Sequence, residues 1–195
     1  MSLRDILTGR HQVKGPAPDR LFAISTAYIA LEAEHQIEPA GTAAIVFQAL
    51  ATSEFEATLR DMEEVVRATG GDSGTSVSTE DDSYGYRWMV LRNPGGAPNV
   101  EDLAVGINAV SSSIETAGHG ERLLCAVFAF ADAQQRAVYM IYNYKRGYWY
   151  PFVPDPDNAQ QRLTERELQL KAQMSSELPL EPELERWFPL WGIPI

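Results

Sequence analysis

The amino-acid sequence predicts an α+β fold in which helices pack against a mainly antiparallel sheet. In two stretches, 55–66 and 100–114, large apolar residues recur at steps of three and four, which is the period of a helix with one buried face. Three other stretches, 42–48, 84–92 and 123–130, have the composition or the alternation of strands. A mainly antiparallel sheet with helices packed on it accommodates both kinds of stretch.

The predicted elements also follow a regular order, as three successive β-β-α units of about 40 to 55 residues each. Such an order is typical of an internal structural repeat. The three units share no sequence beyond this pattern. A repeat and a single sheet without any repeat therefore both stay open.

The length of 195 residues is enough for one domain with a substantial core. We expect this α+β domain at 19–195, including a tail rich in proline and tryptophan, after a leader at 1–18. In the leader, Leu3, Ile6 and Leu7 lie on one side of a short amphipathic helix, which is followed by a linker with glycine and proline. Such a helix either makes weak, salt-sensitive contact with an anionic membrane or packs on the domain.

The stretch 27–34 allows two interpretations. Its alanine and glutamate residues suit a helix, whereas Ile29 and Leu31 alternate with smaller residues as in a strand. We favour the strand. A turn at 39–41 would then lead into a buried strand at 42–48.

The first clear helix begins at Ser53, a good N-cap with Glu56 three positions further on, as in a capping box. Gly70 and Gly71 end this helix. Its apolar stripe consists of Phe55, Leu59, Met62 and Val66.

A short edge strand at 75–79 and a period-two strand at 84–92 are expected next, and the sequence Asn-Pro-Gly-Gly closes the second of them. Asn99 can cap the second helix. The apolar stripe of that helix consists of Val100, Leu103, Ile107, Val110 and Ile114.

The continuously apolar run at 123–130 predicts a central strand covered on both faces, paired across a short turn with a strand at 137–145. Thr164 is expected to cap the third helix. Glu167 stands where it would complete a capping box, and it is four residues from Lys171, with which it could form an ion pair.

Charge, cysteine content and apolar runs argue against a protein that binds nucleic acid, is exported or spans the membrane. The 16 lysine and arginine residues against 27 aspartate and glutamate residues give a net charge of −11, and such a surface repels nucleic acid. Cys125 lies in an apolar run and is expected to be a buried thiol in a reducing compartment. The N-terminus lacks the apolar core of a signal peptide, and the longest apolar run has nine residues. We therefore expect a cytoplasmic protein that does not span the membrane.

No catalytic, cofactor-binding or metal-binding residues are predicted. The string GDSG at 71–74 matches the surroundings of the nucleophile in chymotrypsin-like proteases, but the histidines that precede it do not lie in the required context, so we interpret it as a turn. The three histidines lack ligand spacing, and the acidic run 80–82 is interpreted as a solvated turn. We expect neither a bound transition metal nor a hydrolase activity that depends on Ser73.

Ten of the 19 aromatic residues lie in two short stretches, 139–152 and 187–191. Both contain proline, so part of their backbone is fixed, and both combine tryptophan with a neighbouring arginine, Arg146 or Arg186, as interface hot spots do. We expect the segments 144–152 and 187–191 to lie together as one surface that binds a protein partner; the alternative is that these aromatic residues close the core. The residues expected to bind the partner are Lys145, Arg146, Tyr148, Trp149, Tyr150, Phe152, Arg186, Trp187, Phe188 and Trp191.

Four strings of the chain resemble the PspAB family, the phage-shock-protein-A-associated proteins of actinobacteria and some archaea. They are SLRDILTGR, DSYGYRWMVLR, IYNYKRGYWYPFVP and ERWFPLWGIPI, and the resemblance extends in order over nearly the whole chain. It implies a cytoplasmic component of an envelope-stress system, at the inner face of the membrane. The implied partners are the membrane-binding coiled-coil protein PspA and a membrane metalloprotease of the HtpX type. The resemblance implies no catalytic residues.

Two functional classes therefore stay open. The first is a non-catalytic adaptor that acts through protein–protein contacts in a PspA-type envelope-stress response. The second is an enzyme, either a hydrolase or one acting on a small ligand, with an unrecognised site. Polar groups that converge in a deep pocket would favour the enzyme, and an exposed aromatic patch would favour the adaptor.

Overall fold

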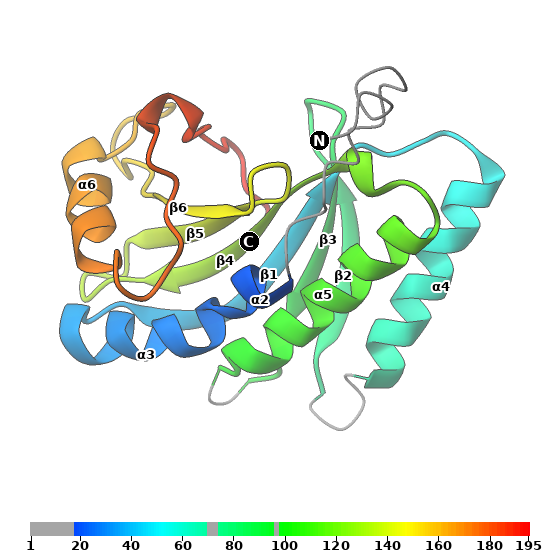
Figure 1. Ribbon diagram of the computed structural model, residues 1–195, viewed down its shortest axis with the longest axis horizontal. Helices are drawn as coiled ribbons and strands as arrows, with labels where there is room; N and C mark the ends of the chain where they lie inside the picture. Colours follow the sequence, from blue (N-terminus) through cyan, green and yellow to red (C-terminus); the bar gives the residue numbers. More distant parts are fainter. Residues whose placement is uncertain (1–17, 70–73, 96–97) are drawn as a thin grey trace, which may run out of the picture.

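The computed structural model describes residues 18–69, 74–95 and 98–195. At its centre is one sheet of six strands in the order β2-β3-β1-β4-β5-β6, antiparallel throughout (Figure 1). The predicted α+β fold with a mainly antiparallel sheet is confirmed. The strands are β1 (Glu38–Phe47), β2 (Ser76–Asp81), β3 (Arg87–Arg92), β4 (Leu123–Ala131), β5 (Ala137–Asn143) and β6 (Tyr148–Phe152).

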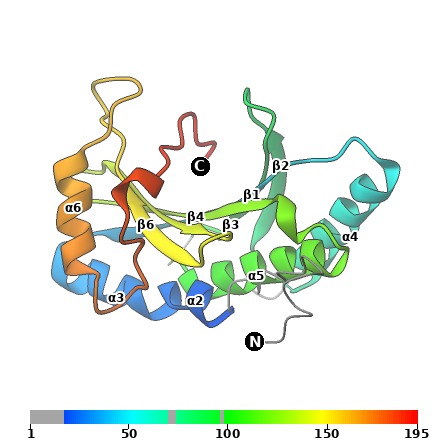
Figure 2. The ribbon, with the colours of Figure 1, turned by 45° about the horizontal axis from the view of Figure 1, so that its top comes forward.

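Four helices pack on one face of the sheet, and α6 lies beside the edge strand β6 (Figures 1 and 2). The C-terminal tail lies on the opposite face, as Figure 2 shows. Short 3-10 turns at Gly120–Arg122 and Leu184–Arg186 complete the described elements. The helices are α2 (Pro18–Phe22), α3 (Ile24–His35), α4 (Ser53–Thr69), α5 (Val100–Thr116) and α6 (Thr164–Gln173).

Alternate residues along the strands enter two separate apolar clusters. Ile45 and Phe47 of β1 pack on the helix side, whereas Ala44 and Val46 belong to a second cluster on the other face. Alternation of this kind follows from the period of two residues in a strand. The continuously apolar run predicted as a central strand is β4, which lies between β1 and β5. The run is continuous because both faces of the sheet are apolar there.

The two amphipathic helices were predicted correctly, and every residue of their apolar stripes is buried. Asn99 caps α5, since its side chain accepts a hydrogen bond from the backbone N–H of Asp102 at 3.0 Å. The cap of α4 is Thr52 instead of Ser53, because the Thr52 hydroxyl accepts the N–H of Phe55 at 3.3 Å.

The favoured strand at 27–34 is wrong, because this stretch belongs to helix α3. Ile24, Ala27 and Leu31 are its buried residues, at steps of three and four, whereas Ile29 is 55% exposed. The two residues whose alternation indicated a strand, Ile29 and Leu31, thus differ in burial, since Ile29 is exposed and Leu31 is buried. Gln36 ends the helix in the left-handed region at φ 55°.

The expected turn at 39–41 is also wrong, because β1 runs through it with a register shift between Pro39 and Ala43. Gly41 has φ 67° there, a backbone conformation that glycine adopts without strain. Of the three β-β-α units, only β2-β3-α5 has the expected order, since α3 precedes β1 and three strands precede α6.

Glu167 has a different role from the one expected. Its carboxylate is buried and accepts hydrogen bonds from Arg162 and from the backbone N–H of Val153, so it neither caps α6 nor pairs with Lys171. Lys171 instead donates to the carbonyl oxygen of Pro182 at 3.0 Å.

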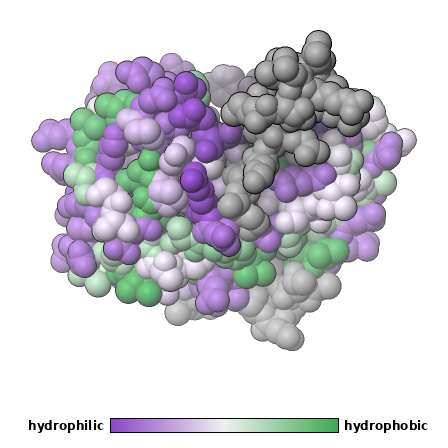
Figure 3. Space-filling model, viewed as in Figure 1, coloured by the Kyte–Doolittle hydropathy of each residue, from purple (hydrophilic) through white to green (hydrophobic). Residues whose placement is uncertain are grey.

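Residues 1–17 of the predicted leader at 1–18 and the stretch 70–73 lie outside the described residues, so the expectations for the amphipathic leader and for Ser73 stay predictions. Within the described ranges, no helix combines the length and the apolar character needed to cross a membrane. Figure 3 shows hydrophilic residues over much of one side of the molecule, with hydrophobic residues in separate patches.

Candidate functional site

The tail at 187–195 crosses the face of the sheet opposite the helices (Figure 2). Its backbone carbonyls accept hydrogen bonds from side chains of three different strands. The Tyr150 hydroxyl donates to Phe188 O at 3.0 Å, the Tyr139 hydroxyl donates to Ile195 O at 3.0 Å, and Arg92 donates to Pro194 O at 3.2 Å. The tail is thus attached to the sheet at both ends.

A cavity of about 470 Å³ lies on this face, between the tail and the turn that joins β2 to β3. This volume is in the usual range for ligand sites. Its floor comes from the strands and its walls from the turn and the tail. The residues of the floor are Val46, Trp88, Leu124, Cys125 and Tyr150, and those of the walls are Asp82, Tyr84, Tyr86, Phe188, Pro189, Leu190 and Trp191.

Asp82 fixes the aromatic wall on the side of the β2–β3 turn. One carboxylate oxygen accepts the backbone N–H groups of Tyr84 and Tyr86 at 2.8 and 2.9 Å, and the other accepts the indole N–H of Trp88 at 2.9 Å. The interpretation of residues 80–82 as a merely solvated turn is therefore wrong. In the part of the chain that is described, no three histidine, cysteine or acidic residues form a group that could bind a metal ion.

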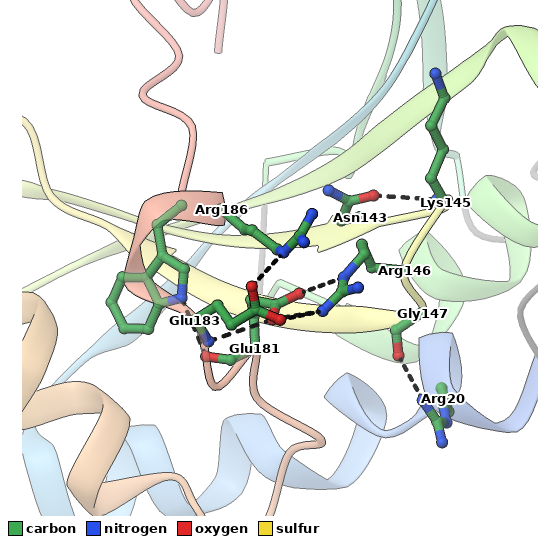
Figure 4. A network of polar contacts seen from close by, with 9 residues as sticks. Arg20, Asn143, Lys145, Arg146, Gly147, Glu181, Glu183 and Arg186 are labelled. Carbon is green, nitrogen blue, oxygen red and sulfur yellow. Dashed lines mark hydrogen bonds and ion pairs between the residues drawn. The ribbon is translucent and has the colours of Figure 1, made fainter.

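Asn143 and Lys145 line one end of the cavity. The side-chain oxygen of Asn143 accepts the backbone N–H of Lys145 at 3.0 Å, which leaves the amide NH₂ group as a donor. Lys145 is exposed and makes no ion pair with any described residue. Its side chain extends away from the neighbouring ion pairs (Figure 4).

Burial keeps the two titratable side chains on the floor of the cavity, Cys125 and Tyr150, protonated. It raises the pKa of the Cys125 thiol to about 12, and it raises the pKa of Tyr150 well above its ordinary value. Cys125 therefore has little thiolate at neutral pH and is a poor nucleophile. The hydroxyl of Tyr150 is already used in the hydrogen bond to the tail.

Beside the cavity, Arg146 and Arg186 form internal ion pairs (Figure 4). Arg146 donates to both carboxylate oxygens of Glu181 at 2.9 and 3.0 Å and to Glu183 at 3.2 Å. Arg186 donates to Glu183 at 2.7 Å. These contacts attach residues 181–186 to the β5–β6 turn, so both arginines, expected to bind a partner, are already engaged within the chain.

Trp149 and Tyr148 also differ from the expectation. Trp149 is fully buried in the cluster on the helix side, and its indole N–H donates to Arg20 O at 2.7 Å. Tyr148 is half-buried, with the guanidinium groups of Arg20 and Arg146 at 4.9 and 6.0 Å from its ring. Neither residue lines the cavity.

The two aromatic stretches do lie together, as predicted. Tyr150 stacks on Trp187 with ring centroids 6.1 Å apart, and Phe152 meets Trp191 at 5.2 Å. Tyr150, Phe152 and Trp187 are nevertheless buried, because the tail closes over them. Of the ten predicted residues, the cavity brings together Lys145, Tyr150, Phe188 and Trp191.

The aromatic residues of the β2–β3 turn were not predicted to belong to the site. Tyr84, Tyr86 and Trp88 recur at every second position, and this was interpreted only as strand alternation. Three large aromatic residues on one face are a signal that could have indicated a second wall. The structure begins β3 at Arg87 and leaves Tyr84 61% exposed.

The family model for PspAB, described as PspA associated protein B, matches residues 1–195. The chain belongs to the PspAB family. Neither a curated protein nor a solved structure matches it. The family description indicates an association with PspA.

In this PspAB family member, the ion pairs of Glu181 should make stability depend on pH. The hydrogen bond from Arg146 lowers the pKa of Glu181 below its ordinary value of 4.5. A carboxyl whose pKa is lowered by folding stabilises the fold above its unfolded-state pKa, and the contribution is lost as the pH falls through the folded-state pKa. Urea unfolding should therefore show a loss below pH 4.5 that is smaller in Glu181→Gln.

The matched control for this prediction is Glu185→Gln, which removes an exposed carboxylate of the same segment. Its stability should fall with pH as steeply as that of the wild type. Parallel curves for the wild type and Glu181→Gln would contradict the prediction.

Proposed function

We propose that this protein is a non-catalytic adaptor of a PspA-type envelope-stress response, in the cytoplasm, and that it acts through protein–protein contacts at the cavity. The observation that carries the proposal is a set of exposed aromatic residues at the cavity wall, which we call the aromatic rim. Tyr84, Tyr86 and Phe188 form this rim and are 61%, 38% and 58% exposed.

Exposed apolar groups gathered around a concavity are typical of protein interaction sites. Aromatic residues are also enriched among interface hot spots. The rim is braced on both sides, by Asp82 under the turn and by the hydrogen bond from Tyr150 to Phe188 O in the tail, so little ordering accompanies binding.

The cavity offers little for catalysis. Its cysteine is protonated, its aspartate already accepts three hydrogen bonds, and no histidine is among the residues that line it. A nucleophile beside a free base is what hydrolysis would require. This composition supports the adaptor over the enzyme, and the family description supports PspA as the partner.

The test is the affinity of the full-length protein for purified PspA. Phe188→Ala should weaken binding by about 2 kcal/mol, roughly 30-fold in Kd, because truncated hot-spot residues at interfaces have effects of this size. The melting temperature should not change, since Phe188 is more than half exposed.

Ile29→Ala is the matched control, because Ile29 is 55% exposed but lies on α3, on the other side of the sheet. We expect its affinity for PspA to equal that of the wild type. The proposal fails if the wild-type protein does not bind PspA, or if both variants bind as tightly as the wild type does.

A further inference from the structure

One end of the cavity, at Lys145 and Asn143, carries free hydrogen-bond donors. The Lys145 ammonium and the Asn143 amide NH₂ group belong to residues two positions apart in sequence, and neither donates to an acceptor among the described residues. The carboxylate that lines the cavity is Asp82, and three donors already occupy it. A group that binds here should therefore supply a hydrogen-bond acceptor, and a negative charge suits Lys145 best.

The rest of the cavity requires an apolar group. Val46, Trp88, Leu190 and Trp191 line it, and the Tyr150 hydroxyl donates to the tail. A polar body placed here would lose its hydrogen bonds with water without replacement. A ligand group that complements this cavity is thus apolar over most of its surface and carries one carboxylate.

A second, more polar cavity of about 460 Å³ adjoins the first, and Asp82, Tyr84 and Trp191 line both. Through these shared residues the first cavity continues into the second. The tail shows that this face can hold a chain segment, since three side chains of the sheet donate to its carbonyl oxygens. Both features favour a peptide segment as the occupant.

We propose that the cavity receives a segment of the protein partner in which a large apolar side chain is followed closely by an acidic one, the apolar side chain entering between Trp88 and Trp191 and the carboxylate meeting Lys145. This inference rests on the proposed adaptor function and adds the chemistry of the anchoring residues. It also assigns a role to Lys145, which makes no ion pair within the described chain although its neighbour Arg146 makes two.

The first experiment tests the chemistry of the cavity with two matched probes, indole-3-acetate and its neutral analogue indole-3-acetamide. The full chain, labelled with ¹⁵N in its four tryptophans, gives one indole N–H signal for each. Trp88 and Trp191 line the cavity, whereas Trp149 lies in the core on the opposite face. Both probes should shift the signals of Trp88 and Trp191 and leave that of Trp149 in place.

Indole-3-acetate should bind about fivefold more tightly than the amide, as expected for an ion pair with an exposed lysine. Lys145→Gln should abolish this preference. Arg60→Gln, which removes an exposed cation of α4, is the matched control and should preserve it. Equal binding of the two probes, or an unchanged preference in Lys145→Gln, would overturn the assignment of a carboxylate to this end of the cavity.

The second experiment asks whether the partner uses the cavity. Indole-3-acetate should compete with PspA, and Lys145→Gln should weaken PspA binding by about fivefold. If PspA binding depends on Phe188 but not on Lys145 or the probe, the adaptor function stands and the anchor inference is wrong. If the probe binds without displacing PspA, the cavity is a site for a small acid, which also overturns the inference. Failure of PspA to bind the wild type would remove the proposed function itself.

Discussion

Replacing Trp149 with alanine should lower the free energy of unfolding by about 3 to 5 kcal/mol, the usual cost of truncating a buried aromatic side chain. Trp149 is fully buried, and its ring lies 5.7 Å from that of Phe128 and 5.1 Å from that of Tyr142. The substitution would leave a cavity on the helix side of the sheet and would leave Arg20 O without the indole donor. Urea unfolding at neutral pH measures the loss.

Phe188→Ala provides the comparison within the same pair of aromatic stretches. Because Phe188 is 58% exposed, its truncation should change the free energy of unfolding by no more than about 0.5 kcal/mol. Trp149→Ala should in turn leave the residues of the aromatic rim in place. A Trp149→Ala protein as stable as the wild type would show that this tryptophan is not a core residue.

The second large effect is expected at the ion pair between Glu167 of α6 and Arg162, which precedes this helix. The Glu167 carboxylate is 1% exposed and accepts hydrogen bonds from Arg162 at 2.7 and 2.9 Å and from the N–H of Val153 at 2.8 Å. Arg162→Met would leave this buried charge without its cation, which typically costs about 3 to 5 kcal/mol. It would also remove the hydrogen bond from Arg162 to Trp187 O at 2.7 Å.

A double variant separates the charge from the packing. In Arg162→Met with Glu167→Gln, the buried charge is absent and the glutamine oxygen can still accept the N–H of Val153, so we expect it to be more stable than Arg162→Met alone. Arg166→Met is the control, because Arg166 lies in α6 beside Glu167 and its guanidinium bonds only weakly, at 3.4 Å, to the exposed Gln169. If the double variant is no more stable than Arg162→Met, the uncompensated charge is not the cause.

Elements with a strong local period were predictable from the sequence, and elements that depend on distant partners were not. Helices α4 and α5 each present one apolar stripe, so their positions followed from spacing alone. Helix α3 has exposed Ile29 as well as buried Leu31, which blurred its period. The residues of strand β6 were expected at a surface because of their aromatic density next to proline. They are buried on both faces of the sheet, and the cover on one face is the tail, which the local sequence does not indicate.

The same distinction holds for the candidate site. Phe188 and Trp191 were recognisable from aromatic density next to proline, and they do line the cavity. Arg146 could not be assigned correctly, because its partner Glu181 is 35 residues away and no spacing rule links them. Tyr84 joins the site through the pairing order of the strands, which places the β2–β3 turn opposite the tail.

The central position of β1 has a consequence for how the chain is made. This strand lies between β3 and β4 and contains the apolar residues Ala43 to Phe47, yet the ribosome adds 84 residues between Phe47 and the end of β4 at Ala131. At a synthesis rate of about 5 to 20 residues per second, one edge of β1 stays unpaired for roughly 4 to 17 seconds. Because an apolar strand with a free edge is prone to aggregate, we expect nascent chains that end before β4 to aggregate more readily than complete ones.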